Sequence, residues 1–239
     1  MIDVSIITTC KGRLSFLKQT LPMMLDQITS FTYEVVVVDY GCPQNTFEWC
    51  KTLEVPNLRV IKVLDNSEIF NLSRARNCGA TVCISRVLLF MDADIKLQSQ
   101  WLQLSALPIL SGEVSITIPW LGKGEITNTP WAGGEKQLGL GLISTYRTFY
   151  LYIRGFDEDM KGWGFEDDCF FFRVKELGKV GRSPGPPLLE IIEHSDDIRF
   201  EHYETNNRAI SHNANQLHAR TRKIVNPNGF GKAKLEVWP

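Results

Sequence analysis

The sequence predicts an α/β protein with a mostly parallel sheet flanked by helices, and three observations indicate this class. Strand-like and helix-like segments alternate over roughly the first hundred residues, as they do in βαβ units. The expected strands are short apolar runs, which is typical of parallel strands buried on both faces. Polar clusters follow three of these runs, at the end of the sheet where parallel strands bind ligands.

The first half of the chain contains four expected strands and two expected helices. Runs of β-branched and apolar residues predict strands at residues 4–9, 34–39, 58–63 and 87–91. A helix with a kink at Pro22 is expected after the first strand, and Ser73 is expected to cap a second helix that ends near residue 85. Apolar residues at steps of three or four predict the buried face of the first helix: Leu14, Leu17, Leu21, Met24 and Ile28.

The second half of the chain has a different texture. Residues 119–141 are rich in Gly and Trp without periodicity and predict long surface loops, after which apolar order returns at residues 142–153. A helix is expected at residues 168–177, ended by Gly178. A turn at 183–187, a short strand at 188–192 and a polar, peripheral helix at 204–224 follow. We therefore expect one compact domain with a C-terminal extension.

Composition excludes several function classes. The 239 residues include 26 Lys and Arg against 27 Asp and Glu, so net charge gives no general attraction to nucleic acid or to an anionic membrane. No run reaches the roughly 20 apolar residues that a transmembrane helix needs. The first residues lack the layout of a signal peptide, and the six cysteines form no C-x-x-C pair. We expect a cytoplasmic protein with reduced thiols.

Two acidic groups follow expected strands. Asp92, Ala93 and Asp94 come directly after the fourth strand, and residues i and i+2 of an extended segment point the same way. Both carboxylates could therefore bind Mg²⁺ or Mn²⁺ and bridge it to phosphates, although a solvated turn is the alternative. Asp39 ends the second strand, where an acid can accept hydrogen bonds from a sugar or a base or can cap the turn.

A third acidic cluster, Glu166-Asp167-Asp168, follows the segment Gly-Trp-Gly-Phe at residues 162–165. Acids in the first turn of a helix stabilise its dipole, which is the structural alternative. Trp163 beside carboxylates also suits a sugar ring, because it combines an apolar face with acceptors for hydroxyl groups. His194 stands just beyond an expected strand, and by itself an isolated His is more typical of a core or surface position.

Taken in order, these segments resemble the inverting glycosyltransferases of family 2, which have the GT-A fold. The resemblance rests on six segments: V-S-I-I-T-T, V-V-V-V-D-Y, S-R-A-R-N-C-G, L-F-M-D-A-D, R-G-F-D-E and G-W-G-F-E-D-D. From Gly139 to about His212 the chain is more similar to β-1,4-galactosyltransferases and chondroitin polymerase. In those enzymes G-W-G-x-E-D-D precedes a helix and then a metal-binding His, which corresponds to His194.

The resemblance implies a role for each matching residue. Asp167 would be the catalytic base, and Asp94 and His194 would hold Mn²⁺, with Mg²⁺ as the alternative. Donor-binding residues would be Thr8, Thr9, Arg13, Asp39, Arg76, Asp92 and Ala93. Residues around the donor sugar and the acceptor would be Gly141, Trp163, Glu166 and Asp168.

Two departures from the pattern stand out. The galactosyltransferases have F-N-R-A where this chain has Phe70-Asn71-Leu72-Ser73, so an arginine contact is lost unless Arg74 or Arg76 replaces it. Their methionine metal ligand corresponds to Ile191, which cannot coordinate.

We therefore expect a GT-A domain at residues 1–203, with a nucleotide-sugar-binding half at 1–115 and an acceptor half at 116–203, followed by a helical extension at 204–239. The expected activity is metal-dependent, inverting transfer of a sugar from a nucleotide-sugar, by preference a UDP-sugar, to a glycan or other hydroxyl acceptor, as in polysaccharide biosynthesis. The alternatives are a retaining glycosyltransferase, a metal-dependent sugar nucleotidyltransferase and a non-catalytic sugar-binding module.

Overall fold

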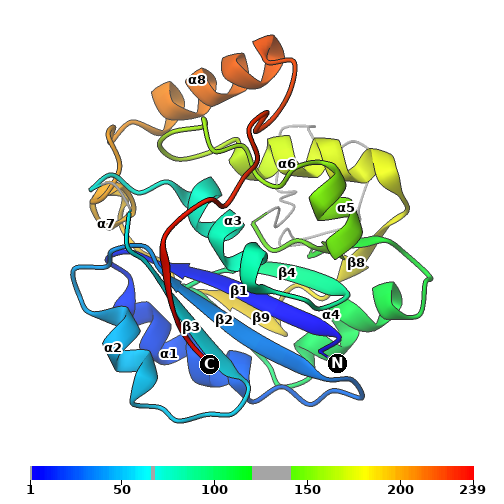
Figure 1. Cartoon of the computed structure of the whole chain (residues 1–239). Coiled ribbons are helices and arrows are strands. Elements are labelled where there is room, and N and C mark those ends of the chain that lie inside the picture. Colours follow the sequence, from blue (N-terminus) through cyan, green and yellow to red (C-terminus); the bar gives the residue numbers. More distant parts are fainter. Residues whose placement is uncertain (1, 66–67, 120–140) are drawn as a thin grey trace.

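Four parallel strands form the centre of the protein (Figure 1). The computed structural model describes residues 2–65, 68–119 and 141–239, so most of the predicted 119–141 loop lies outside the described residues. The central strands are β1 (Val4–Cys10), β2 (Tyr33–Asp39), β3 (Leu58–Val63) and β4 (Val87–Asp92). They belong to an eight-stranded sheet with the order β10-β3-β2-β1-β4-β7-β6-β8.

The outer strands make the sheet mixed. β7 (Ser144–Tyr146) runs antiparallel to β4 and to β6 (Ile116–Pro119), and β6 pairs in parallel with β8 (Val180–Ser183). β10 (Leu235–Trp238) pairs antiparallel with β3 at the opposite edge. A separate two-stranded sheet joins β5 (Ile95–Leu97) to β9 (Leu189–Ile191). The predicted class, a mostly parallel sheet flanked by helices, is confirmed.

Helices cover both faces of the sheet because successive strand residues point to opposite sides. Val37 belongs to the apolar cluster under α1 (Leu14–Leu25), α2 (Thr46–Lys51) and α4 (Trp101–Leu110). Val36 belongs to the cluster under α3 (Leu72–Val82), α5 (Arg147–Tyr152) and α6 (Glu166–Val174). Both clusters consist of buried side chains, so each face of the central strands contributes to the core.

Several local predictions needed correction. Helix α1 ends at Leu25, and Ile28 lies beyond it with 66% of its surface exposed. Helix α3 is capped by Asn71 rather than Ser73, since the Asn71 side chain accepts the backbone N–H of Arg74 at 2.8 Å. Helix α6 begins at Glu166, continues as a 3₁₀ turn at Lys175–Leu177 and is followed by Gly178, as predicted.

The C-terminal part of the chain is tied to the rest of the molecule. The predicted peripheral helix forms α8 (Arg208–Thr221), which lies on α6, and a short helix α7 (Asp196–Phe200) precedes it (Figure 1). The chain then returns to the main sheet as β10, so the extension that was predicted as helical ends in a strand. Within the described residues, no helix is long and apolar enough to cross a membrane.

Candidate active site

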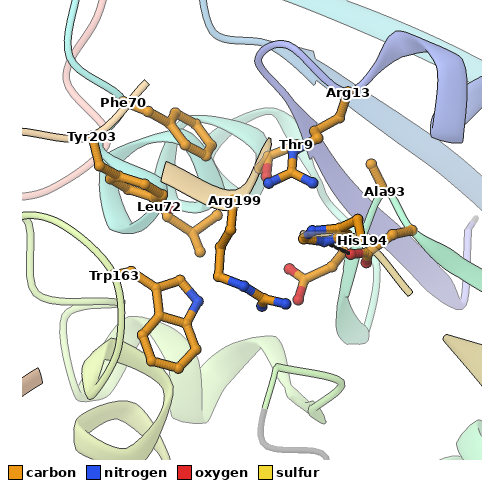
Figure 2. A pocket seen from close by; sticks show the side chains of 11 residues that line it. Thr9, Arg13, Phe70, Leu72, Ala93, Trp163, His194, Arg199 and Tyr203 are labelled. Carbon is orange, nitrogen blue, oxygen red and sulfur yellow. Dashed lines mark hydrogen bonds and ion pairs between the residues drawn. The ribbon is translucent and has the colours of Figure 1, made fainter. Parts of the chain in front are cut away.

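A cavity lies at the carboxyl ends of β1 and β4. Thr9 stands opposite Asp92 in the strand register, so the ends of these strands form one wall. The cavity encloses about 500 Å³, including its open mouth, and Figure 2 shows Arg13, Arg199 and His194 directed into it. Its predicted lining residues are Thr9, Arg13, Asp92, Ala93, Asp94, Trp163 and His194. Its lining residues that were not predicted as site residues are Phe70, Leu72, Arg199 and Tyr203.

Asp94 and His194 meet although 100 positions separate them in the sequence. The β5–β9 pairing brings them together, because Asp94 precedes β5 and His194 follows β9. His194 Nε2 lies 2.9 Å from Asp94 Oδ2, and His194 Nδ1 lies 3.1 Å from the carbonyl oxygen of Ser195. Burial and the neighbouring Asp92 raise the pKa of Asp94, while His194 and Arg13 oppose that rise. Both predicted metal ligands therefore face one point.

A buried arginine lies behind Asp92. Arg76 Nη2 donates to Asp92 Oδ1 at 2.9 Å, and Arg76 Nη1 lies 3.6 Å from Glu166 Oε1. The guanidinium also stacks on the ring of Phe156 at 4.9 Å, and only 1% of the residue is exposed. Gly141 packs against this pair, since a Cβ there would lie 3.1 Å from Asp92 Oδ2.

The three α6 acids follow a strained turn. Gly162, Gly164 and Phe165 have φ values of 73°, 93° and 70°, and a left-handed conformation is unfavourable for a phenylalanine. This turn places Glu166, Asp167 and Asp168 in the first turn of α6.

The environments of these acids differ. Burial and then Asp167 raise the pKa of Glu166 to about 8, and the same two causes raise the pKa of Asp168 to about 7. Burial also raises the pKa of Asp167, but Arg76 and the backbone N–H of Asp168 oppose the rise. Arg76 and a backbone N–H also support ionised Glu166, but there the charge of Asp167 has the larger effect, whereas for Asp167 the largest effect after burial is the support from Arg76.

Comparison with known proteins identifies the family. The sequence pattern of the family described as Glycosyl transferase family 2 matches residues 5–181. The chain belongs to this family. Its fold resembles that of S. aureus TarS: the structure of TarS 1-349 in complex with UDP has a TM-score of 0.63 and 16% identity, and the match covers 84% of this chain and 63% of that one. A second crystal structure of S. aureus TarS has a TM-score of 0.62 and 15% identity, and the match covers 84% of this chain and 38% of that one.

A curated relative points to the same class of enzyme. Polypeptide N-acetylgalactosaminyltransferase 8 of Drosophila melanogaster is 22% identical over 164 residues, which are 56% of this chain and 28% of that protein. The chain thus spans less than two thirds of the length of each of these proteins. The predicted family and its GT-A fold are confirmed, and the predicted enzyme class, a glycosyltransferase, is the class that the family's description names.

In this member of glycosyltransferase family 2, α8 supports the strained turn. Asn215 of α8 donates to the carbonyl of Gly164 at 2.7 Å and accepts the backbone N–H of Lys161 at 3.2 Å. The ring of His212 packs edge-on against Phe165 at 5.3 Å. The helix predicted to be peripheral is therefore a support of the α6 acids.

Trp163 is held at the mouth of the cavity by cations. The guanidinium carbons of Arg199 and Arg208 lie 5.7 and 5.2 Å from its ring centre. Arg199 follows the predicted ligand His194 by five positions, and this short spacing is the feature of the sequence that could have identified it as a site residue. No sequence pattern marked Tyr203, which packs on Phe70 at 5.6 Å.

Other predicted residues lie outside the described cavity lining. Asp39 accepts the backbone N–H groups of Cys42 and Phe47 at 2.7 and 2.8 Å, which is the turn-capping alternative. Within the part of the chain that the structure describes, the buried hydroxyl of Thr8 has no hydrogen-bond partner. Arg76, Gly141, Glu166, Asp167 and Asp168 are not among the described lining residues. The donor, base and acceptor roles of these residues stay predictions.

A second group of potential metal ligands lies away from the cavity. Among the described residues, Asp157, Asp159 and His218 place ligand atoms within 4.8 Å of one another. Arg222 occupies this group: it pairs with Asp157, with Asp159 at 2.7 Å and with His218 at 3.0 Å. Since the arginine already supplies the positive charge, this cluster fastens α8 to the segment that follows α5.

Proposed function

We propose that this protein is a metal-dependent, inverting glycosyltransferase that uses a UDP-sugar donor and a hydroxyl group of a glycan or glycoconjugate as acceptor. One observation carries the proposal: the paired side chains of Asp94 and His194 share a cavity wall with Asp92, and Arg76 links Asp92 to the α6 acids. TarS, whose fold this chain shares, has been solved with UDP and with UDP-GlcNAc, which supports a UDP-sugar.

The geometry around His194 suits a divalent cation. A neutral imidazole has one N–H, yet both ring nitrogens of His194 face oxygen acceptors. A cation between His194 and Asp94 would resolve this conflict. Octahedral bonds of about 2.0–2.1 Å place neighbouring ligand atoms roughly 3 Å apart, and the two side-chain atoms are 2.9 Å apart. A carboxylate with one imidazole suits Mn²⁺, with Mg²⁺ as the alternative. Such a cation would neutralise charge on a departing diphosphate.

Two arginines in the cavity support binding of a diphosphate. Arg13 and Arg199 both line it, and a guanidinium forms paired hydrogen bonds with phosphate oxygens. Leu72 also lines the cavity at the position where the galactosyltransferase pattern has an arginine. Arg74 does not replace that arginine, because it pairs with Asp65 and donates to Tyr40. Arg199 approaches the same cavity from α7 and would supply the cation instead.

The proposed chemistry is a single displacement. Asp167 would accept the proton of an acceptor hydroxyl, whose oxygen attacks the anomeric carbon on the face opposite the leaving UDP. The bond from the anomeric carbon to the acceptor oxygen forms as the bond to the diphosphate breaks. An α-linked donor would therefore give a β-glycoside.

A donor screen tests the proposal. The protein is incubated with a panel of UDP- and GDP-sugars, with Mn²⁺ or with EDTA, and the released nucleotide is measured. Metal-dependent release of UDP, lost in Asp94→Asn, is expected. If added pyrophosphate converts the donor into a nucleoside triphosphate and a sugar 1-phosphate, the protein is a nucleotidyltransferase, and sugar binding without release would indicate a binding module. Once an acceptor is found, NMR of the product decides between inversion and retention.

A further inference from the structure

Arg76 occupies a position that binding of donor phosphate does not explain. Arg76 is only 1% exposed, and it is not among the described residues that line the cavity. One Nη donates to Asp92, the other faces Glu166, and the guanidinium plane rests on Phe156. A buried arginine with two carboxylates around it has its charge satisfied within the protein, so it is poorly placed to receive a diphosphate.

The two carboxylates belong to different parts of the fold. Asp92 ends β4, on the cavity wall that also contains Asp94, whereas Glu166 begins α6 beside Asp167. Arg76 projects from α3, which precedes both of them in the sequence. We propose that Arg76 is a positioning residue whose buried guanidinium holds Asp92 and Glu166 together, and so fixes the α6 acids relative to the donor side of the site. This inference rests on the proposed function.

The contact with Glu166 is incomplete in this state. The 3.6 Å separation is longer than a hydrogen bond, and both Arg76 Nη1 and Glu166 Oε2 are buried without a hydrogen-bond partner among the described residues. Unpartnered buried polar groups are costly, so a small closing movement of α6 would be favourable. Hydrogen bonds at catalytic sites are often long in the free enzyme and tighten in the substrate complex. Arg76 can provide that tightening without touching substrate.

Arg76 also balances charge around the proposed base. The charged or titratable groups near Asp167 are Arg76 from α3, Asp92 from β4, and its own neighbours Glu166 and Asp168, with Tyr203 close to Glu166 and Asp92. Arg76 is the cation in this group. Loss of an opposite charge at such distances typically moves a carboxyl pKa by about 1–3 units. Without Arg76, the α6 acids should hold their protons to higher pH.

The test compares Arg76→Met with a matched control, Arg59→Met. Arg59 of β3 pairs with the buried carboxylate of Glu34 of β2 at 3.1 Å, and neither residue lines the cavity. Both changes remove the partner of a buried acid, so both should lower Tm. The carboxyl titration is followed by NMR in metal-free protein labelled with ¹³C at Asp and Glu carboxyl carbons. Arg76→Met should raise the midpoint of the Glu166 titration by about 1–2 pH units. Arg59→Met should leave it unchanged. The Glu166 signal is assigned from its absence in Glu166→Gln.

Kinetics supply the second readout. Arg76→Met should lower kcat by about 10–100-fold, move the acid limb of kcat/KM to higher pH, and change UDP affinity with Mn²⁺ less than fivefold. Arg76→Lys keeps the charge without the guanidinium fork, so it should restore most of the pH profile and only part of kcat. If Arg76→Met does not fold, the kcat and pH profile of Arg76→Lys still test the inference.

Two results would overturn the inference: an unchanged carboxyl titration in Arg76→Met, or a loss of UDP binding with kcat intact, which would make Arg76 a phosphate ligand. If the wild type transfers no sugar, the proposed function fails, yet the titration still decides whether Arg76 is coupled to Glu166.

Discussion

Replacing Asp167 by Asn is the sharpest test of the proposed chemistry. The amide keeps the shape of the side chain but cannot accept a proton from the acceptor. Loss of a general base typically costs about 10²–10⁴-fold in rate, or roughly 3–5 kcal/mol of activation free energy. Binding of UDP with Mn²⁺ should change little, because Asp94 and His194 line the cavity whereas Asp167 is not among its described lining residues. The loss should therefore appear in kcat.

The structure also ranks the three α6 acids. With a pKa of about 8, Glu166 would be ionised in only about one tenth of molecules at pH 7, and Asp168, with a pKa of about 7, in about half. After burial, the largest effect on Asp167 is the charge of Arg76, which favours ionisation, whereas the largest effect on Glu166 and on Asp168 is the charge of Asp167, which opposes it. At pH 7 the Asp167→Asn change should thus reduce kcat more than Glu166→Gln or Asp168→Asn.

The assay measures UDP release and product formation from pH 5 to 9, with UDP affinity determined by calorimetry. In the wild type, kcat/KM should fall as pH drops through the raised pKa of Asp167, because the base becomes protonated. In Asp167→Asn that limb should disappear along with most of the activity. Transfer close to the wild-type rate, or a loss explained wholly by weaker donor binding, would refute the assignment. A larger loss in Glu166→Gln would identify Glu166 as the base.

Three further outcomes are expected. His194→Ala should weaken Mn²⁺-dependent UDP binding at least tenfold. His218→Ala should not, because His218 belongs to the cluster whose charge Arg222 neutralises. If the Mn²⁺ titrations of wild type and His194→Ala coincide, Asp94 and His194 do not share a metal ion. The folded-state pKa of Glu166 is raised from 4.5 to about 8, so its contribution to stability is complete below pH 4.5 and is lost as pH rises to about 8. Urea unfolding should therefore show Glu166→Gln gaining roughly 2–4 kcal/mol relative to wild type between pH 5 and 8, and a constant difference would argue against a neutral buried Glu166. Gly79→Ala should cost about 1–3 kcal/mol, since its Cβ would lie 2.6 Å from Ile7; an unchanged Tm would show that α3 can move off the sheet.

The central strands were predictable because local sequence determines them. Four valines in β2 and the apolar run of β4 can be buried only in the middle of a sheet, and β3 has the predicted bounds. The polar residues at the carboxyl ends of these parallel strands must lie at the same edge of the sheet, and Thr9 accordingly stands opposite Asp92.

Elements whose partners are distant in the sequence could not be predicted. Strands β5, β6, β8 and β10 have three or four residues each and are defined by the neighbours that pair with them. Helix α4 is apolar on most sides and contains Pro108, so it shows no amphipathic period. His194 had no signal of its own, and only the family resemblance, not the residues themselves, paired it with Asp94.

The position of the α6 acids depends on parts of the chain far from them. Phe165 adopts a left-handed conformation that its own sequence does not favour, so the turn must be held from outside. Asn215 and His212 of α8 provide that hold, and α8 is followed by β10, which pairs with β3 in the main sheet. A boundary at residue 203 would therefore separate the proposed base from its support. The geometry of Asp167 follows from tertiary contacts of the C-terminal segment as much as from the Gly-Trp-Gly motif that precedes it.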